Sequence, residues 1–337
     1  MPDSPSPPRR FCVIGGPTAG GKSALAMALA RRLAALGRRP EIIAADAFQI
    51  YRGMDIGTAK PSPADRAEFP HHLIDVVSPT DRFTVDDWRR AAEGAIADIR
   101  RRDGLPIVVG GTHLYIKALL DGLFDGPPPD PALRAALAAT PPAELRRELE
   151  RADPVAAARI HPNDARRTVR ALEVYRQTGR PISALQSQWD NAGTRADALL
   201  VTIYLPTDEL NRRINARVRR MLADGLVAEI RALLAAGGLG PQAAEALGYK
   251  QLIPLLSLPE AARPDIPPAL LDEAVERIKI ETRRFAKNQR TWLRRLSATP
   301  GAIRIESPDA AGDEAVERIV GGLCPDSIRT RANGNPT

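Results

Sequence analysis

The fold is decided by one stretch near the N-terminus, Phe11-Cys12-Val13-Ile14-Gly15-Gly16-Pro17-Thr18-Ala19-Gly20-Gly21-Lys22-Ser23. Residues 11–14 predict a short buried strand, and residues 16–23 fit the phosphate-binding pattern G-x-x-x-x-G-K-[ST]. In this pattern backbone N–H groups surround phosphate oxygens, the lysine neutralises charge and the hydroxyl binds Mg²⁺. We therefore predict a pyrophosphate-binding P-loop with Ser23 as the Mg²⁺ ligand. The motif leaves open whether the pyrophosphate belongs to a nucleotide or to another carrier.

Strand and helix patterns alternate after this loop. Apolar residues recur at helical spacing over 25–36, and Gly37 is placed to end that helix. Thr84 begins a capping box for a helix that runs to about Asp103. Further strands are predicted at residues 41–45, 73–77 and 106–109. This alternation predicts an α/β fold with a parallel sheet, in which ligands bind beyond the carboxyl ends of the strands. That edge is where the chain would deliver Gly16, Asp46 and Thr112.

Composition changes along the chain and suggests five segments. After a disordered N-terminus at residues 1–10, the P-loop core is expected at 11–127 and ends in a stiff proline-rich linker at residues 126–131. A helical insertion, rich in Ala, Arg, Leu and Glu, is expected at 128–196. The chain is then expected to return to the core through a strand at 201–205, followed by basic helices, over 197–323. A disordered tail is expected at 324–337.

Overall composition restricts the class of protein. The 337 residues are 44% hydrophobic and carry a formal charge of +7, which suits a globular protein with an anionic partner. Cys12 and Cys324 are the only cysteines, so a disulfide framework and a cysteine zinc site are both excluded. The N-terminus lacks the apolar stretch of a signal peptide, and no segment reaches the length of a membrane span. We expect a cytoplasmic protein without membrane association.

Seven motifs together resemble the tRNA dimethylallyltransferase family. They lie at residues 16–23, 46–60, 70–75, 110–115, 170–174, 248–250 and 282–292. The resemblance covers nearly the whole chain and implies a P-loop NTPase-like parallel sheet with an inserted helical tRNA-binding domain. It also implies transfer of a dimethylallyl group from dimethylallyl pyrophosphate to the N6 amine of the adenosine immediately 3′ of the anticodon. The expected partners are the tRNA anticodon stem-loop and dimethylallyl pyrophosphate, with Mg²⁺ as cofactor and a monomeric enzyme.

The resemblance assigns catalytic roles to three residues. Asp46 is the general base, because the adenine amine is a poor nucleophile whose proton must be removed as it attacks carbon. Thr112 and Arg283 stabilise the negative charge that grows on the leaving pyrophosphate. Simpler interpretations are a magnesium contact or helix cap for Asp46, a helix N-cap for Thr112 and a solvated loop amide for Gln49. The residues assigned to tRNA are Asp46, Ala47, Phe48, Gln49, Thr112, Arg134, Arg166, Arg167, Thr168, Val169, Arg170, Lys287 and Arg290.

Two basic patches support an RNA partner. On a helix expected at 273–295, a stripe of basic side chains at spacings of four, three and four could follow a nucleic-acid backbone; it consists of Arg283, Lys287, Arg290 and Arg294. Within the insertion, Arg166 and Arg170 lie one helical turn apart. Either patch could instead be a solvated helix face.

Small departures from the family pattern remove no needed group. Gly20 and Ala47 stand where relatives often carry serine, and Ser23 replaces the commoner threonine. The chain lacks the zinc-finger extension of eukaryotic relatives, which favours a bacterial-type enzyme. Three alternatives stay open: an isopentenyltransferase acting on free adenine nucleotides, a small-molecule kinase that uses this P-loop, and a nucleotide-dependent RNA-binding module without transferase chemistry.

Overall fold

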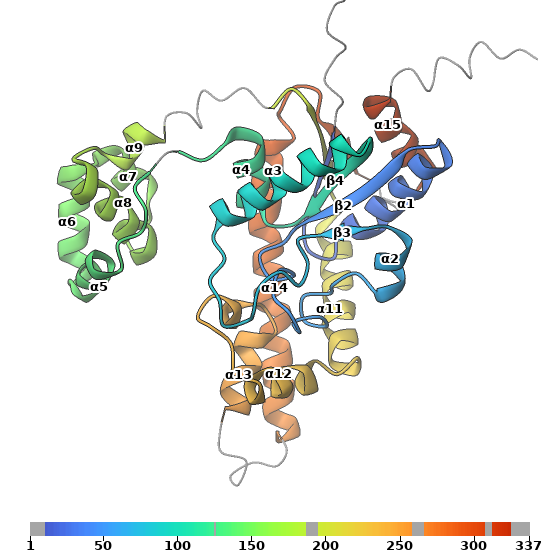
Figure 1. Ribbon diagram of the computed structural model, residues 1–337. Coiled ribbons are helices and arrows are strands. Elements are labelled where there is room, and N and C mark those ends of the chain that lie inside the picture. Colours follow the sequence, from blue (N-terminus) through green and yellow to red (C-terminus); the bar gives the residue numbers. More distant parts are fainter. Residues whose placement is uncertain (1–10, 125, 187–194, 258–265, 307–311, 325–337) are drawn as a thin grey trace, which may run out of the picture. The chain divides into compact units, whose positions relative to one another are not determined.

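The computed structural model describes residues 11–124, 126–186, 195–257, 266–306 and 312–324. The chain divides into two compact units, an α/β unit of Met1–Leu120 with Arg195–Thr337 and a helical unit of Asp121–Thr194 (Figure 1). The segments expected to be disordered at 1–10 and 325–337 lie outside the described residues. Cys324, expected at the start of the tail, is buried beside the last helix. Within the described residues, no helix combines the length and apolar character needed to cross a bilayer.

The α/β unit is built on a six-stranded sheet. Its strands are β1 (Phe11–Gly15), β2 (Arg39–Ala45), β3 (His71–His72), β4 (Gly104–Gly110), β5 (Ala198–Ile203) and β6 (Ile303–Ile305). The order across the sheet is β3-β2-β4-β1-β5-β6, and every neighbouring pair is parallel. The predicted parallel α/β architecture is therefore confirmed. Because all six strands point the same way, their carboxyl ends share one edge of the sheet.

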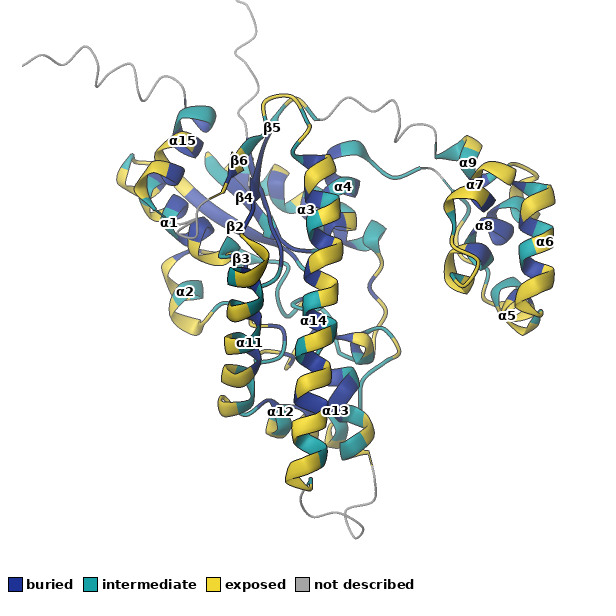
Figure 2. Cartoon of the chain, turned by 180° about the vertical axis from the view of Figure 1, so that it is seen from behind, coloured by how far each residue is buried: buried dark blue, intermediate teal, exposed yellow. Residues whose placement is uncertain are grey.

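Alternate residues of the strands build a core on each face of the sheet. In β1, Phe11 and Val13 face one core while Cys12 and Ile14 face the other, as the two-residue period of a strand requires. The first core is covered by α3 (Val85–Arg101), α4 (His113–Asp121) and part of α14 (Pro268–Leu296). The second is covered by α1 (Lys22–Ala35) and α15 (Asp313–Leu323). Both layers surround a sheet that is almost entirely buried (Figure 2).

A helical extension follows β5 in the same unit. It consists of α11 (Thr207–Ala223), α12 (Leu226–Ala235), a 3₁₀ turn at Ala243–Glu245, α13 (Tyr249–Leu256) and the long α14, while the short α2 (Pro63–Glu68) follows β2. Helix α14 packs along α11 and α13 and runs well beyond the sheet (Figure 1). Its buried residues recur at helical spacing from Ala274 to Leu296, and the opposite face is exposed (Figure 2). The helix is six residues longer than the 273–295 that the sequence predicted.

One predicted strand is wrong. Residues 73–77 were expected to be extended, but β3 ends at His72, and only an isolated bridge joins Val77 to Tyr51. Leu73 and Asp75 have positive φ angles of 62° and 57°, which turn the backbone out of the sheet. The four apolar residues on either side of Asp75 gave no sign of these turns. The sequence analysis also did not predict β6 or α15, which complete one edge of the sheet.

The described part of the helical unit contains five short helices. They are α5 (Pro131–Ala139), α6 (Pro142–Ala152), α7 (Pro154–Arg159), α8 (Ala165–Thr178) and α9 (Ile182–Leu185). Leu137, Leu149 and Leu172 are fully buried in its own small core. The unit begins at Asp121, seven residues before the predicted 128, and ends at Thr194 instead of 196. The prediction used the proline-rich linker as the boundary, whereas these prolines belong to the helical unit.

Candidate functional site

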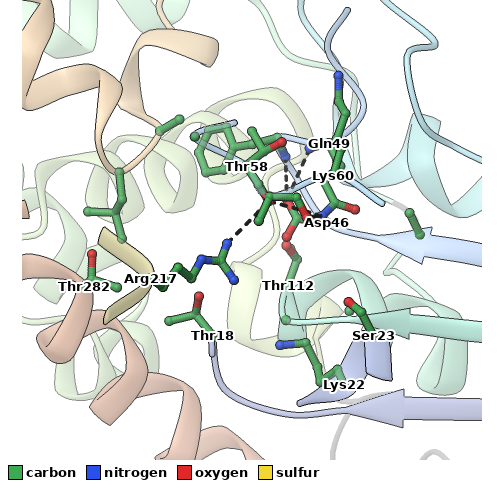
Figure 3. Close-up of a pocket in the computed structure, with 18 of the residues that line it drawn as sticks. Thr18, Lys22, Ser23, Asp46, Gln49, Thr58, Lys60, Thr112, Arg217 and Thr282 are labelled. Carbon is green, nitrogen blue, oxygen red and sulfur yellow. Dashed lines mark hydrogen bonds between the residues drawn. The ribbon is translucent and has the colours of Figure 1, made fainter. Parts of the chain in front are cut away.

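A cavity of about 640 Å³ lies at the carboxyl edge of the sheet, within the α/β unit (Figure 3). Seven of the residues that were assigned a catalytic or binding role from sequence line it: Thr18, Lys22, Ser23, Asp46, Phe48, Gln49 and Thr112. The far wall comes from α11, α13 and α14, which contribute polar side chains from Arg217, Lys250 and Thr282, among others. The expectation that the strand ends deliver functional groups to one place is met for the P-loop, Asp46 and Thr112.

Close packing between β2 and β4 brings Asp46 and Thr112 together. A Cβ atom on Gly110 would lie 2.0 Å from the carbonyl oxygen of Ala45, so only glycine permits this approach. Thr112 Oγ1 accepts a hydrogen bond of 3.0 Å from the backbone N–H of Ala47. Thr112 N–H donates in turn to the carbonyl oxygen of Ala45. Thr112 thus ties the end of β4 to the start of the loop that carries Asp46.

The P-loop has a left-handed backbone at two positions and is anchored by α14. Gly21 precedes α1 with φ 88°, and Ala19 adopts φ 58°. Gln289, buried in α14, accepts a hydrogen bond of 2.8 Å from Thr18 N–H and donates one of 2.9 Å to the carbonyl oxygen of Gly111. One amide side chain therefore holds the phosphate loop against the end of β4. The sequence analysis quoted Gln289 within a motif but gave it no role.

Two of the cationic side chains that line the cavity, Lys22 and Arg217, are desolvated. Lys22 Nζ donates to the carbonyl oxygen of Pro17 at 2.7 Å. Arg217 Nη2 donates to the carbonyl oxygen of Thr58 at 3.4 Å (Figure 3). Burial and repulsion from Arg217 lower the pKa of Lys22 to about 8, and the attraction of Asp46 offsets part of that shift. Burial lowers the pKa of Arg217 as well. Two desolvated cations that repel each other make a site that favours an anion such as pyrophosphate.

Arg217 was missed by the sequence analysis. It belongs to α11, and of the arginines on that helix only Arg217 lines the cavity. The arginines of α11 are Arg212, Arg213, Arg217, Arg219 and Arg220. The helical pattern places Arg217 on the same face as the buried Ile214 and Val218. This position was the one feature of the sequence that could have indicated that Arg217 faces the interior. It could not distinguish Arg217 from its neighbours without knowing what packs against α11.

Asp46 combines a structural and a free carboxylate oxygen. Its Oδ1 accepts the backbone N–H groups of Phe48 at 2.9 Å and Gln49 at 3.3 Å. Its Oδ2 has no hydrogen-bond partner among the residues that the structure describes. The carboxylate also attracts the charges of Lys22 and Arg217. Asp46 therefore caps its own loop with one oxygen while the other stays available for a ligand.

Three other predicted residues on α14 lie at different places. Arg283 does not line the cavity; its Nη1 donates to Asn215 Oδ1 on α11 at 3.2 Å. Arg290 donates to the Thr207 hydroxyl at the start of α11, and Lys287 is exposed. The arginine of α14 that does reach the cavity lining is Arg284. The roles assigned to Arg283, Lys287 and Arg290 stay predictions.

In the helical unit, two predicted RNA-contacting arginines surround a buried carboxylate. The Glu173 side chain is fully buried, and it accepts hydrogen bonds from Arg134 Nη2 at 2.9 Å, Arg170 Nη1 at 2.6 Å and Asp130 N–H at 2.8 Å. Arg170 also donates to the carbonyl oxygen of Pro127. Burial alone would raise the pKa of Glu173, but the hydrogen bonds from Arg134 and Arg170 hold it below the usual glutamate value. Arg134 and Arg170 thus stabilise this unit.

The remaining predicted residues of α8 divide between surface and core. Arg166 is exposed and has no partner in the described part of the chain. Arg167 is exposed and forms a loose ion pair with Asp164 at 3.4 Å. Thr168 is buried and donates to the carbonyl oxygen of Asp164, while Val169 packs against the core of the unit. Of the Arg166 and Arg170 patch, only Arg166 is unpaired.

Comparisons with known proteins place the chain in a family. The family model described as "IPP transferase" matches residues 49–296. A tRNA dimethylallyltransferase of Citrifermentans bemidjiense is 50% identical over 84% of this chain and 88% of its own length, and one of Geobacter metallireducens is 46% identical over 85% and 90%. A tRNA isopentenylpyrophosphate transferase of Bacillus halodurans superposes with a TM-score of 0.64 at 33% identity, covering 96% of this chain and 99% of that one. A eukaryotic dimethylallyltransferase described as acting on tRNA superposes with a TM-score of 0.77 at 28% identity, over 96% and 80%.

Proposed function

Because this chain belongs to the IPP transferase family, we propose that it transfers a dimethylallyl group from dimethylallyl pyrophosphate to adenosine in tRNA. The proposed acceptor is the N6 amine of the adenosine immediately 3′ of the anticodon. One observation carries the proposal: the P-loop and its Lys22 face the same cavity as Asp46, which has an unpartnered carboxylate oxygen in the described part of the chain. The phosphate site and the base thus open into one cavity, where the two substrates can meet.

In the proposed reaction, the N6 lone pair forms a bond to the first carbon of the dimethylallyl group. The bond from that carbon to the pyrophosphate oxygen breaks, and its electron pair leaves with pyrophosphate. Asp46 Oδ2, acting as the general base, takes a proton from the attacking amine. The products are N6-dimethylallyladenosine, pyrophosphate and one proton. ATP is not consumed.

The leaving pyrophosphate gains charge as the bond breaks, so donors already in place stabilise the transition state more than the ground state. Lys22 and Arg217 are the cations that line the cavity near the P-loop. The backbone N–H groups of the loop add neutral donors. Arg217 is thus a second candidate for the charge-stabilising role that the resemblance assigns to Arg283.

A magnesium ion fits this site through oxygen ligands. The Ser23 hydroxyl lines the cavity, and a hard cation of this kind often takes the rest of its ligands from substrate phosphates and water. In the described part of the chain, no three His, Cys, Asp or Glu side chains gather into a metal site of their own. Ser23 and the pyrophosphate would therefore hold the ion, which would neutralise charge on the leaving group.

The proposal also covers how the enzyme works in the cell. We propose a monomer acting on the anticodon stem-loop in the cytoplasm. The exposed basic side chains of α8 and α14 support RNA as the partner, because a free nucleotide needs no extended positive surface. Analytical sedimentation of the protein, with and without an anticodon stem-loop, would test whether the enzyme is a monomer.

The decisive experiment is mass spectrometry of nucleosides from tRNA incubated with the enzyme, dimethylallyl pyrophosphate and Mg²⁺. We expect N6-dimethylallyladenosine at the position 3′ of the anticodon and stoichiometric pyrophosphate. Free AMP, tested in parallel, should be a poor acceptor. If AMP matches tRNA in catalytic efficiency, the enzyme is an adenylate isopentenyltransferase; release of ADP from ATP would instead favour a kinase.

A further inference from the structure

Glu229 on α12 clamps a turn of the cavity loop. Its Oε2 accepts the backbone N–H groups of Asp55 at 2.8 Å and Ile56 at 2.6 Å, and its Oε1 accepts that of Gly57 at 3.2 Å. Three successive N–H groups on one carboxylate fix the direction of the turn, and bonds to an ionised acceptor are stronger than neutral ones. Helix α12 itself contributes no residue to the cavity lining. Glu229 can therefore influence a ligand only through the loop it holds.

Tyr249, the first residue of α13, completes the clamp. Its buried hydroxyl donates to Glu229 Oε1 at 2.5 Å. Its ring lies so close to Gly57 that a Cβ there would be 2.3 Å from the ring, so the turn can approach only as glycine. Burial and the bond to Glu229 raise the pKa of Tyr249 far above its usual value, so the phenol stays a donor. The turn is held by two helices.

The clamped turn determines how Gln49 is oriented. Directly after it, the carbonyl oxygens of Thr58 and Ala59 both accept from Gln49 Nε2, each at 3.2 Å (Figure 3). Carbonyl oxygens only accept, so the amide nitrogen must face them, and both of its hydrogens are used. Gln49 Oε1 has no partner in the part of the chain that is described, and it can only accept. Toward a ligand, Gln49 can therefore act only as a hydrogen-bond acceptor, through Oε1.

We propose that Glu229 is a positioning residue that makes the acceptor site select an amino group over an oxo group at the purine C6 position. Through the turn it holds Gln49 with its amide oxygen free for a hydrogen-bond donor. An adenine N6 amine donates, whereas the C6 oxygen of hypoxanthine or guanine accepts and would face Gln49 Oε1 unpaired. This inference rests on the proposed function in naming adenine as the acceptor base.

The test compares Glu229→Gln with Glu273→Gln in the full-length protein. Both substitutions remove one negative charge, so they change the net charge equally. Glu273 is the control because it is exposed on α14. In the absence of dimethylallyl pyrophosphate, we would measure the binding of two anticodon stem-loops. The two differ only in having adenosine or inosine at the acceptor position. We expect wild type and Glu273→Gln to prefer adenosine by about tenfold, the effect of one unpaired polar group. Glu229→Gln should reduce this preference to less than about threefold.

Two further measurements separate positioning from general damage. Hydrogen exchange should speed up at residues 55–57 in Glu229→Gln, and the KM for dimethylallyl pyrophosphate should stay within about twofold of wild type because the P-loop is anchored separately by Gln289. If Glu229→Gln does not fold, Tyr249→Phe removes one hydrogen bond of the same clamp and should show the same changes at smaller size.

The outcomes are distinct. Faster exchange in the turn with an unchanged preference for adenosine would overturn the assignment of Glu229, as would an equal loss in both variants. The preference is a binding ratio and needs no transfer. A wild-type enzyme that selects adenosine but never forms N6-dimethylallyladenosine would contradict the proposed function and leave the role of Glu229 standing.

Discussion

The cavity of the α/β unit and the N-terminal part of α8 in the helical unit use charged residues in opposite ways. At the cavity, Lys22, Arg217 and Asp46 come together with few direct contacts to one another, so their charges are available to a ligand. In the helical unit, Arg134 and Arg170 donate hydrogen bonds to Glu173, so their charges are already paired. A basic residue in a family motif can therefore offer its charge to a ligand only when the fold leaves that charge unpaired.

The largest expected effect comes from removing the cation of the P-loop. Lys22→Ala should lower kcat/KM for dimethylallyl pyrophosphate by about a thousandfold, because it removes a donor whose interaction strengthens as the leaving group gains charge. Steady-state kinetics with saturating tRNA would measure this change. Binding of the stem-loop should stay near wild type. Stoichiometric ATP hydrolysis during turnover of the wild-type enzyme would rule out this use of the loop.

Asp46→Asn should lower kcat by about a hundredfold or more, since asparagine keeps the shape but cannot take the proton. The amide oxygen of the substituted side chain can still accept from the N–H groups of Phe48 and Gln49, so the loop should keep its fold. Affinity for tRNA, measured by filter binding, should change little. A matching loss of affinity and turnover would make Asp46 a structural or RNA-contacting residue.

The helical unit should respond to Glu173→Ala by losing stability. Removing one partner of a buried ion pair leaves Arg134 and Arg170 facing each other without a counter-ion, at a cost of about 3 kcal/mol. Limited proteolysis should cleave residues 121–194 faster, while binding of dimethylallyl pyrophosphate by the α/β unit is kept. Glu150→Ala, at an exposed position of α6, provides the control and should behave as wild type. Unchanged proteolysis in Glu173→Ala would remove the distinction between paired and free arginines.

A smaller effect is expected from pH. The pKa of Lys22 is lowered to about 8 in the free protein, so its charge is present below pH 8 and is lost above it. If that charge binds pyrophosphate, kcat/KM for the donor should fall about tenfold per pH unit above pH 8. Burial and the nearby Lys22 lower the pKa of His113 to about 4, so it stays neutral over this range. In Lys22→Ala the break near pH 8 should disappear; a break that persists would belong to another group.

The sequence predicted most of the residues on the P-loop side of the cavity. The motif at residues 16–23 fixes a strand, a loop and a helix together, and short strands bring Asp46 and Thr112 to the same edge. Arg217 and Glu229 had no such local signature, and the motif that contains Gln289 did not reveal its role. These roles depend on how α11, α12 and α14 pack. Arg170 shows the converse: its spacing from Arg166 suggested a joint surface, but a buried carboxylate three residues later determines its contacts.

The smallest expected effect separates the two arginines of α8. Arg166→Glu should weaken stem-loop binding about three- to fivefold and reduce the salt dependence of binding by about one unit of slope, as expected for one lost phosphate contact. Binding of dimethylallyl pyrophosphate and the thermal transition should not change, because Arg166 is exposed and unpaired in the described structure. Arg151→Glu makes the same charge reversal on the exposed face of α6, and it should leave the slope nearly intact.

Arg170→Glu makes the contrasting variant of that experiment. It places a second carboxylate beside the buried Glu173, so it should lower the thermal transition and weaken RNA binding through loss of structure. Binding measured across a salt series, together with melting curves, distinguishes the two cases. Affinity that falls in Arg166→Glu only as far as in Arg151→Glu would show that Arg166 acts through net charge, and would leave the helical unit without an assigned RNA contact at the start of α8.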